Sequence, residues 1–294
     1  MKTKNNDANK PYFQDQQAGI VDYQYFKAPG GSLYFRGPMP SSLEKDSFFT
    51  CIGAAQTFGR FCEKPFCQIL SEEISLPCLN LGYAGAGPSF FLINDYLFEL
   101  INKSRFVIVQ AMSGRSESNS HYHSYLGRNI LKRVSDQSQI IDTDAYNEIL
   151  RKNSLDLVRK IVQETRYSWL RNTTTLLERI QPKTCLLWFS ERKPEYKTSF
   201  NSVQSLFSKF PQLVDESLMD AVKVIPSDYV ECVSSIGLPQ KLVKQNSQIA
   251  AQVSYGYGDK VKTSEYNKYY PSPEMHVEAA KLLLPICEKL VKDI

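Results

Sequence analysis

Five short apolar segments rich in β-forming residues alternate along this chain with stretches in which apolar residues recur at helical spacing. The strand-like segments are 48–53, 78–81, 106–112, 184–189 and 229–233. The helical patterns cover 61–75, 90–103, 145–180, 203–210 and 277–293. Continuous apolar strands that alternate with helices are typical of a parallel sheet covered by helices on both faces. The sequence therefore predicts an α/β fold with a mainly parallel five-stranded sheet.

One domain accounts for most of the 294 residues, because a chain of this length can bury one large core. Residues 1–20 are polar and rich in Asn, Gln and Asp, which predicts a flexible N-terminal arm before a single domain at 21–294. Glycines and a proline bound 30–38, so we expect a short strand there at the edge of the sheet. The stretch at about 121–183 is predicted to form a mainly helical cap or insertion.

Composition excludes several classes of protein. Apolar residues make up 42% and charged residues 22% of the chain, which is ordinary for a globular domain. No apolar run approaches the roughly 20 residues that cross a bilayer, and no apolar segment of a secretion signal follows the start. We therefore expect no membrane span and a cytoplasmic location. A net charge of +4 is too small and dispersed to indicate a nucleic-acid partner, although it slightly favours an anionic ligand.

The seven cysteines are odd in number and include no Cys-x-x-Cys pair. Several of them lie in apolar, strand-like segments, so buried free thiols are the expected state. Their spacing does not indicate a structural zinc site. The sequence predicts no metal and no cofactor.

The first of four candidate site loops runs from Gly53 to Gly59 and joins a predicted strand to a helix. Such a turn presents its side chains at the carboxyl edge of a parallel sheet. Two interpretations stay open. The glycines can simply allow a tight turn in which Ala54 and Ala55 pack, or the backbone amides, with Gln56 and Thr57, can hold an anionic or carbonyl group.

The second loop, 80–89, has glycines at positions 82, 85 and 87 directly after a strand. Their spacing is not that of the dinucleotide-binding fingerprint, so a structural turn and a ligand-binding turn are equally compatible with it.

The third loop, 112–123, is the most polar cluster in the chain. Arg115 is placed to bind a carboxylate, phosphate or sulfate, although a solvated, hydrogen-bonded loop is the alternative. His121 and His123 would point the same way on an extended chain, but no carboxylate at ligand spacing accompanies them.

The fourth loop, 269–276, precedes the last helix and contains Tyr269, Tyr270 and His276. His276 is a candidate general base, and the alternative is a half-buried structural residue at the start of the helix.

These four loops together resemble the conserved blocks of the SGNH (GDSL-type) hydrolase superfamily. Gly53, Thr57 and Gly59 match the first block, but Ala54 and Ala55 stand where that family has an acid and its catalytic serine. The resemblance implies a flavodoxin-like three-layer sandwich. It also implies an oxyanion site at the turn.

The other blocks match in part. Asn80, Gly82 and Gly85 fit the second block, and the resemblance makes Gly85 an oxyanion donor. In the third block Ser116 takes the usual asparagine place, which leaves Asn119 as a displaced candidate. The last block matches His276, but Pro273 stands where the partner acid is expected, and Glu274 would orient the histidine only by a different geometry.

The chain as a whole resembles an uncharacterised bacterial family, a domain of unknown function. The segments that carry this resemblance are 22–25, 35–38, 53–59, 80–82, 109–112, 186–188 and the final histidine at 276. A fainter similarity links residues 53–56 to the Gly-Asn-Cys-Gln turn of acyltransferase candidates in polysaccharide biosynthesis, again with Ala55 at the reactive place.

Two functions follow from these observations. The first is acyl transfer or ester hydrolysis on a glycan without a serine nucleophile, with His276 as base and Ala55, Gln56, Thr57, Gly85, Arg115 and Asn119 around the substrate. The second is a non-catalytic domain that binds a small molecule or glycan. A sulfotransferase-like use of nucleotides is the weakest option, since no phosphate-binding loop of the Gly-x-x-x-x-Gly-Lys type is present. Nothing indicates an oligomeric state.

Overall fold

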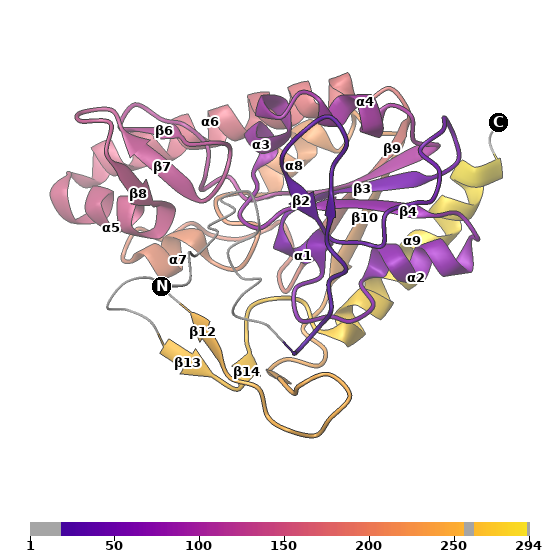
Figure 1. The fold of residues 1–294 in the computed structure, drawn as a ribbon. Helices are drawn as coiled ribbons and strands as arrows, with labels where there is room; N and C mark the ends of the chain where they lie inside the picture. Colours follow the sequence, from indigo (N-terminus) through magenta and orange to yellow (C-terminus); the bar gives the residue numbers. More distant parts are fainter. Residues whose placement is uncertain (1–18, 256–261, 293–294) are drawn as a thin grey trace, which may run out of the picture.

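A five-stranded parallel sheet forms the centre of the computed structural model, which describes residues 19–255 and 262–292 (Figure 1). Its strands are β3 (Phe49–Gly53), β4 (Cys78–Gly82), β5 (Phe106–Gln110), β9 (Lys183–Ser190) and β10 (Asp228–Val233). They lie in the order β10-β9-β5-β3-β4, and every neighbouring pair is parallel. Each corresponds to one of the five segments predicted from sequence, so the α/β fold and the parallel sheet are confirmed.

The strand order places a crevice at the carboxyl edge of the sheet. From β3 the chain passes to β4 on one side and then to β5 on the other side, which gives the flavodoxin-like order 2-1-3-4-5 among the sheet strands. The strand order reverses between the neighbouring strands β3 and β5, so the connections that follow them leave the sheet in opposite directions. A gap therefore opens between the loops after these two strands. Ligands of open α/β sheets bind in that crevice, outside the carboxyl ends of the strands. Here it lies beyond β3 and β5.

Helices cover both faces of the sheet (Figure 1). One face packs against α3 (Pro88–Ile93), α4 (Leu97–Ile101), α6 (Leu155–Arg179) and α8 (Glu216–Val222). The other packs against α2 (Phe66–Glu73) and α9 (Pro273–Lys292). Strand side chains alternate between the two cores: Val107 and Val109 face the first, and Phe106 and Ile108 face the second. This is why the strands read as unbroken apolar runs.

The helical predictions need correction at their ends or interiors. The pattern at 61–75 is helical in α2 only, Phe66–Glu73, and the pattern at 203–210 ends at Phe207. The pattern at 90–103 forms two short helices, α3 and α4. The pattern at 145–180 is divided between α5 (Asp142–Lys152) and α6, because the side chain of Ser154 accepts the N–H of Leu157 and starts a new helix. The last helix begins at Pro273, four residues before the predicted start, so that His276 belongs to its first turn.

The insertion predicted as mainly helical, 121–183, begins instead with a small antiparallel sheet. Its strands are β6 (Tyr122–Ser124), β7 (Ile130–Arg133) and β8 (Gln139–Ile141), in the order β6-β7-β8. Tyr122 and Leu131 are buried in a separate apolar core with residues of α5, α6 and α7 (Val203–Phe207), while their strand neighbours are more exposed. Alternating burial favours strands over helices at this point.

The remaining strands form small sheets of their own. The strand predicted within 30–38 is β2 (Tyr34–Phe35), which pairs with β1 (Phe26–Lys27) and does not join the central sheet. The reason is that Phe35 is fully buried against Tyr83 on one face of the sheet, with ring centroids 5.7 Å apart.

Two further pairs form in the segment before α9. They are β11 (Gln240–Lys241) with β14 (Tyr266–Asn267), and β12 (Val253–Tyr255) with β13 (Lys262–Ser264). The short helix α1 (Ala55–Phe58) follows β3. Residues 1–18 of the predicted N-terminal arm lie outside the described residues. Among the helices of the described chain, none combines the length and apolarity that a bilayer crossing needs.

Candidate functional site

The turn after β3 is held by a glutamine of the neighbouring strand. Gln110 Oε1, at the end of β5, accepts hydrogen bonds from the Ala54 N–H at 3.0 Å and from the Thr57 hydroxyl at 2.7 Å. Gly53 has to be a glycine here, since a Cβ would collide with the Thr57 hydroxyl and lie 2.5 Å from Gln110 Oε1. Thr57 is fully buried, and its hydroxyl stabilises the turn through the hydrogen bond to Gln110.

Two other side chains, those of Asn80 and Arg36, hold the turn through hydrogen bonds to its main chain. Asn80 Nδ2 donates to the Thr57 carbonyl at 3.0 Å, and its Oδ1 accepts the Gly82 N–H at 2.9 Å. The buried guanidinium of Arg36 donates to main-chain carbonyls at the end of α1 and after it, those of Phe58, Gly59, Cys62 and Glu63. The turn is therefore a rigid platform, which is what a preorganised binding site needs.

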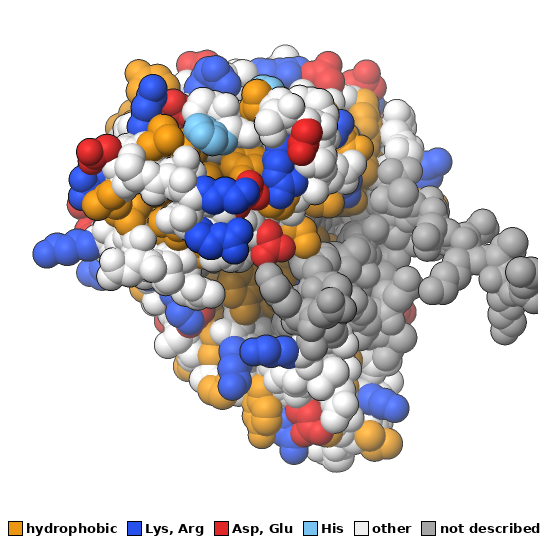
Figure 2. Space-filling model, turned by 90° about the vertical axis from the view of Figure 1, so that its left-hand side faces the viewer, with side chains coloured by type: hydrophobic (Ala, Val, Ile, Leu, Met, Phe, Trp, Pro, Cys, Tyr) orange, Lys and Arg blue, Asp and Glu red, His pale blue; other side chains and the backbone are white. Residues whose placement is uncertain are grey.

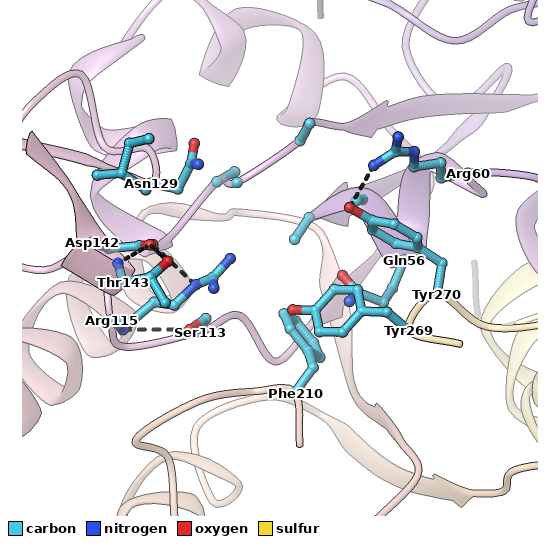
Figure 3. Close-up of a pocket in the computed structure, with 16 residues that line it drawn as sticks. Gln56, Arg60, Ser113, Arg115, Asn129, Asp142, Thr143, Phe210, Tyr269 and Tyr270 are labelled. Atoms are coloured by element: carbon cyan, nitrogen blue, oxygen red, sulfur yellow. Dashed lines mark hydrogen bonds and ion pairs between the residues drawn. The ribbon is translucent and has the colours of Figure 1, made fainter. Parts of the chain in front are cut away.

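A cavity of about 210 Å³ opens above this turn, at the crevice that the strand order predicts (Figure 3). We call it the carboxyl-edge pocket. The loops after β3, β4 and β5 contribute to it, together with the insertion, residue 210 and the segment before α9. Its lining residues are Ala54, Ala55, Gln56, Arg60, Ala84, Gly85, Ala86, Ser113, Arg115, Asn129, Ile141, Asp142, Thr143, Phe210, Tyr269 and Tyr270.

Charges stand on two sides of the pocket (Figure 3). On one side Arg115 Nε lies 3.0 Å from Asp142 Oδ2. Burial raises the pKa of the Asp142 carboxyl, and the Arg115 charge opposes this rise. On the other side Arg60 donates to the Tyr270 hydroxyl at 2.6 Å and lies over that ring, 4.6 Å from its centroid. Two arginines against one aspartate leave the described lining with one positive charge in excess.

Uncharged polar groups also line the pocket on both sides (Figure 3). Gln56 is only 3% exposed, and its Oε1 has no hydrogen-bond partner among the described residues. The Tyr269 hydroxyl accepts from Gln212 Nε2 at 2.8 Å, and burial raises the pKa of Tyr269. The Thr143 hydroxyl donates to Asp142 Oδ1 at 3.1 Å. A buried acceptor without a donor is costly, so the Gln56 carbonyl is a place where a ligand donor would be stabilised.

Four of the residues predicted from sequence come together in this pocket: Ala55, Gln56, Gly85 and Arg115. Gly85 has a φ of 74°, and a Cβ at this position would lie 2.5 Å from Asn129 Oδ1, so the loop after β4 needs a glycine here. Ala55 presents a methyl group at the position where the resemblance expects a nucleophile. A methyl group cannot form an acyl-enzyme.

Two further predicted ligand-binding residues do not line the pocket. Thr57 is held inside the turn by Gln110. Asn119 lies in the core of the insertion, where its Nδ2 donates to the Thr165 hydroxyl at 3.0 Å and its Oδ1 accepts the N–H groups of His121 and Tyr122. Both side chains use their polar atoms to fix loops.

His276 is also away from the pocket, in the core between α9, α2 and β9. Its side chain is fully buried, and its Nδ1 accepts the Phe66 N–H at 3.2 Å. The rings of Phe66 and Phe189 lie against it, with centroids at 6.0 Å and 5.2 Å. Burial, with a smaller contribution from the charge of Arg36, lowers the pKa of His276 to about 3. This geometry supports the structural alternative for His276 and gives the catalytic prediction no support.

Sequence reasoning missed part of the lining: Arg60, Asn129, Asp142, Thr143 and Phe210. Arg60 directly follows Gly59, so an extension of the first loop by one residue would have found it. Asn129 and Asp142 belong to the insertion, whose position over the sheet has no sequence signal. The fourth loop does reach the pocket, but through Tyr269 and Tyr270.

Figure 2 views the molecule from the side of the insertion, and basic side chains gather near the middle of this face with acidic ones among them.

Among the described residues, the two histidines of the third loop do not form a metal site with other side chains. His123 is exposed, and His121 Nδ1 lies 3.1 Å from the Ser120 hydroxyl oxygen. Within residues 19–255 and 262–292, no three His, Cys, Asp or Glu side chains are grouped to hold a metal ion.

Comparisons with solved structures find similarity at low identity to two hydrolases and to a third protein. The lipase Lip_vut3 from a goat rumen metagenome has a TM-score of 0.43 and 12% identity, over 80% of this chain and 94% of that chain. A carbohydrate esterase family 2 enzyme with a carbohydrate-binding domain, from Corynascus thermopiles (Myceliophthora fergusii), has a TM-score of 0.38 and 13% identity, over 88% of this chain and 73% of that one.

A Lactobacillus plantarum protein has a TM-score of 0.39 and 10% identity, over 83% of this chain and 98% of that one.

No curated protein sequence matches the chain significantly. The family described as "Domain of unknown function (DUF6473)" matches residues 12–291. This match spans nearly the whole sequence, and the chain therefore belongs to the DUF6473 family.

Proposed function

We propose that this chain is a ligand-binding domain whose carboxyl-edge pocket takes a small anion that also carries hydroxyl groups, such as an acidic sugar. The observation that carries the proposal is the buried Gln56 Oε1, an acceptor without a partner among the described residues, in a lining with excess positive charge. The acceptor requires a donor on the ligand, and the guanidinium groups of Arg60 and Arg115 favour an anion. A sugar acid or sugar phosphate supplies both.

The size and walls of the pocket agree with this ligand class. A cavity of about 210 Å³ admits roughly one sugar ring. Phe210, Tyr269 and Tyr270 give one wall aromatic surface on which the apolar face of a sugar can pack. Covalent ester cleavage is not favoured, because Ala55 offers no nucleophile and His276 is enclosed in the core.

Isothermal titration calorimetry with three probes tests this proposal. We expect glucuronic acid and glucose 6-phosphate to bind and neutral glucose to bind at least about tenfold more weakly, since it lacks the anion. Gln56→Glu should weaken binding of both acids, because it places a carboxylate beside them. Gln181→Glu is the matched control, since residue 181 is exposed and outside the lining.

Equal affinity for glucuronic acid and glucose would contradict the anion requirement. Unchanged affinity in Gln56→Glu, with circular dichroism like that of the original chain, would contradict the position of the anion beside Gln56. Absence of binding by both acids would reject the ligand class.

One observation favours a second function, transfer of an acyl group by direct attack of a bound hydroxyl. The Asp142 carboxyl lines the pocket, and burial raises its pKa above the ordinary value, which is the direction that favours a general base. With p-nitrophenyl acetate as donor and glucuronic acid as acceptor, this function requires acetylated sugar as product. Asp142→Asn should then lower the rate about a hundredfold, while glucuronic acid still binds.

A further inference from the structure

Three cysteines from different elements meet under the sheet face that α2 covers. Cys51 lies in β3, Cys67 in the first turn of α2, and Cys78 at the start of β4. Cys78 Sγ is 3.7 Å from Cys51 Sγ, and both thiols lie close enough to that of Cys67 to lower its pKa. All three are free thiols. This cluster is distinct from the carboxyl-edge pocket, since none of its members lines that pocket.

A second cavity gives access to two of these thiols. It holds about 190 Å³, and Cys67 and Cys78 line it together with Arg36 and Asn80. We call it the thiol pocket. Cys78 is half-buried, whereas Cys51 is fully buried and does not line the cavity. A small reagent that enters the thiol pocket therefore meets Cys67 and Cys78 first.

The surroundings of Cys67 favour its thiolate. Burial alone would raise the pKa of Cys67, but hydrogen bonds with the Cys51 and Cys78 thiols and the charge of Arg36 hold it well below its usual value. Asn80 Nδ2 lies 3.1 Å from Cys67 Sγ and donates to it. In contrast, burial raises the pKa of the Cys287 thiol to about 12. The Asn80 donor and the position in the thiol pocket beside Arg36 thus set Cys67 apart from Cys287, a buried cysteine of the same core.

We propose that Cys67 is a hydroperoxide-reactive thiol and that Cys78 resolves the oxidised form as a disulfide. The Cys67 thiolate attacks one peroxide oxygen; an S–O bond forms, the O–O bond breaks, and the leaving hydroxide takes up a proton to become water. The Cys78 sulfur then attacks the Cys67 sulfenic acid; an S–S bond forms, the S–O bond breaks, and a second water leaves with the Cys78 proton. Two thiols are oxidised and one peroxide is reduced to two waters.

Backbone constraints select Cys78 over Cys51 as the resolving residue. Cys51 lies inside β3 and is paired on both sides, with Asn80 of β4 and Ile108 of β5. Cys78 is the first residue of the edge strand β4 and follows the short connection 74–77 from α2. Disulfide formation needs Cβ atoms to approach closely. A strand end at the sheet edge can make this movement with less loss of hydrogen bonding than a central strand.

Mass spectrometry of the folded 294-residue chain after treatment with hydrogen peroxide tests the proposal. We expect a single disulfide, Cys67 to Cys78, in the original chain. In Cys78→Ala the sulfenic-acid reagent dimedone should label Cys67. In Cys287→Ala, the control for loss of a buried thiol, the same disulfide should form. Before oxidation, iodoacetamide should modify Cys67 at least about tenfold faster than Cys287.

A first disulfide between any other pair would overturn the assignment of Cys78, and dimedone on another cysteine would overturn that of Cys67. Cys67 that stays reduced until the chain is unfolded by urea would overturn the proposal as a whole. These outcomes involve no sugar ligand, so they are independent of whether the carboxyl-edge pocket binds one.

Discussion

Replacing His276 with asparagine tests whether this histidine is a structural residue of the core. In the folded chain Nδ1 accepts the Phe66 N–H, so this nitrogen is unprotonated and the imidazole is neutral. Asparagine has an oxygen that can accept the same N–H, but it has no proton to gain near neutral pH. His276→Asn therefore keeps the hydrogen bond and removes the titration.

The size of the effect follows from the pKa of His276 in the two states. Burial lowers it from 6.5 to about 3 in the folded chain, while the unfolded chain keeps the ordinary value. As the pH falls below 6.5, the unfolded state gains a proton that the folded state does not, so stability is lost until the pH reaches the folded pKa. Between about pH 7.5 and pH 5, the free energy of unfolding should fall by about 2 kcal/mol on account of this residue.

Urea unfolding followed by circular dichroism at these two pH values measures the effect. We expect the original chain to lose about 2 kcal/mol more stability than His276→Asn when the pH is lowered. Subtracting the loss of unfolding free energy in His276→Asn from the loss in the original chain cancels the contributions of the other titrating groups. His123→Asn, at an exposed position, is the matched control and should behave like the original chain.

Equal losses in the original chain and in His276→Asn would refute the reasoning, as would an NMR titration that places the His276 pKa near 6.5. A catalytic activity that disappears in His276→Asn while the fold persists would also refute it, because an enclosed neutral imidazole cannot exchange protons with a substrate.

Three further substitutions have expected outcomes. Ala55→Ser should give no burst of p-nitrophenol from p-nitrophenyl acetate and no adduct with a fluorophosphonate, since no histidine lines the pocket among the described residues; either product would contradict this. Burial raises the pKa of Glu117 from 4.5 to about 7, so its contribution to stability is lost as the pH rises. Between about pH 5 and pH 8 the original chain should lose about 2.5 kcal/mol more than Glu117→Gln in urea unfolding. Gly53→Ala should destabilise the chain by about 1–3 kcal/mol in the same assay, because the new Cβ collides with the Thr57 hydroxyl; an unchanged midpoint would show that the turn can relax.

The strands of the central sheet could be predicted from sequence because each is an apolar run with turn residues on both sides. The loops that follow β3, β4 and β5 were predictable as neighbours for the same reason, since parallel strands bring their carboxyl ends to one edge. Ala55, Gln56, Gly85 and Arg115 meet in one pocket as a consequence.

The other features of the candidate site depend on tertiary packing, which local sequence patterns do not show. The orientation of His276 is set by the residue at which α9 begins, and the apolar pattern placed that start at 277, four residues after the actual one. The contribution of Asp142 and Asn129 depends on where the insertion packs, which is decided by a separate apolar core. The polar atoms of Thr57 and Asn119 are used by neighbouring side chains that are distant in sequence.

Asn80 contacts both sites described above. Its Nδ2 group donates to the Thr57 carbonyl under the carboxyl-edge pocket and to the Cys67 sulfur in the thiol pocket. We expect a change in the charge or position of this sulfur to alter the position that Asn80 prefers, and a ligand that fixes the turn to do the same through the Thr57 carbonyl. Thermodynamic linkage then requires the effects to be reciprocal: oxidation changes ligand affinity by the factor by which the ligand changes the oxidation equilibrium. Calorimetry with glucuronic acid on the reduced and oxidised chain would measure this factor. Equal affinities would show that Asn80 does not couple ligand binding to oxidation of the cysteines.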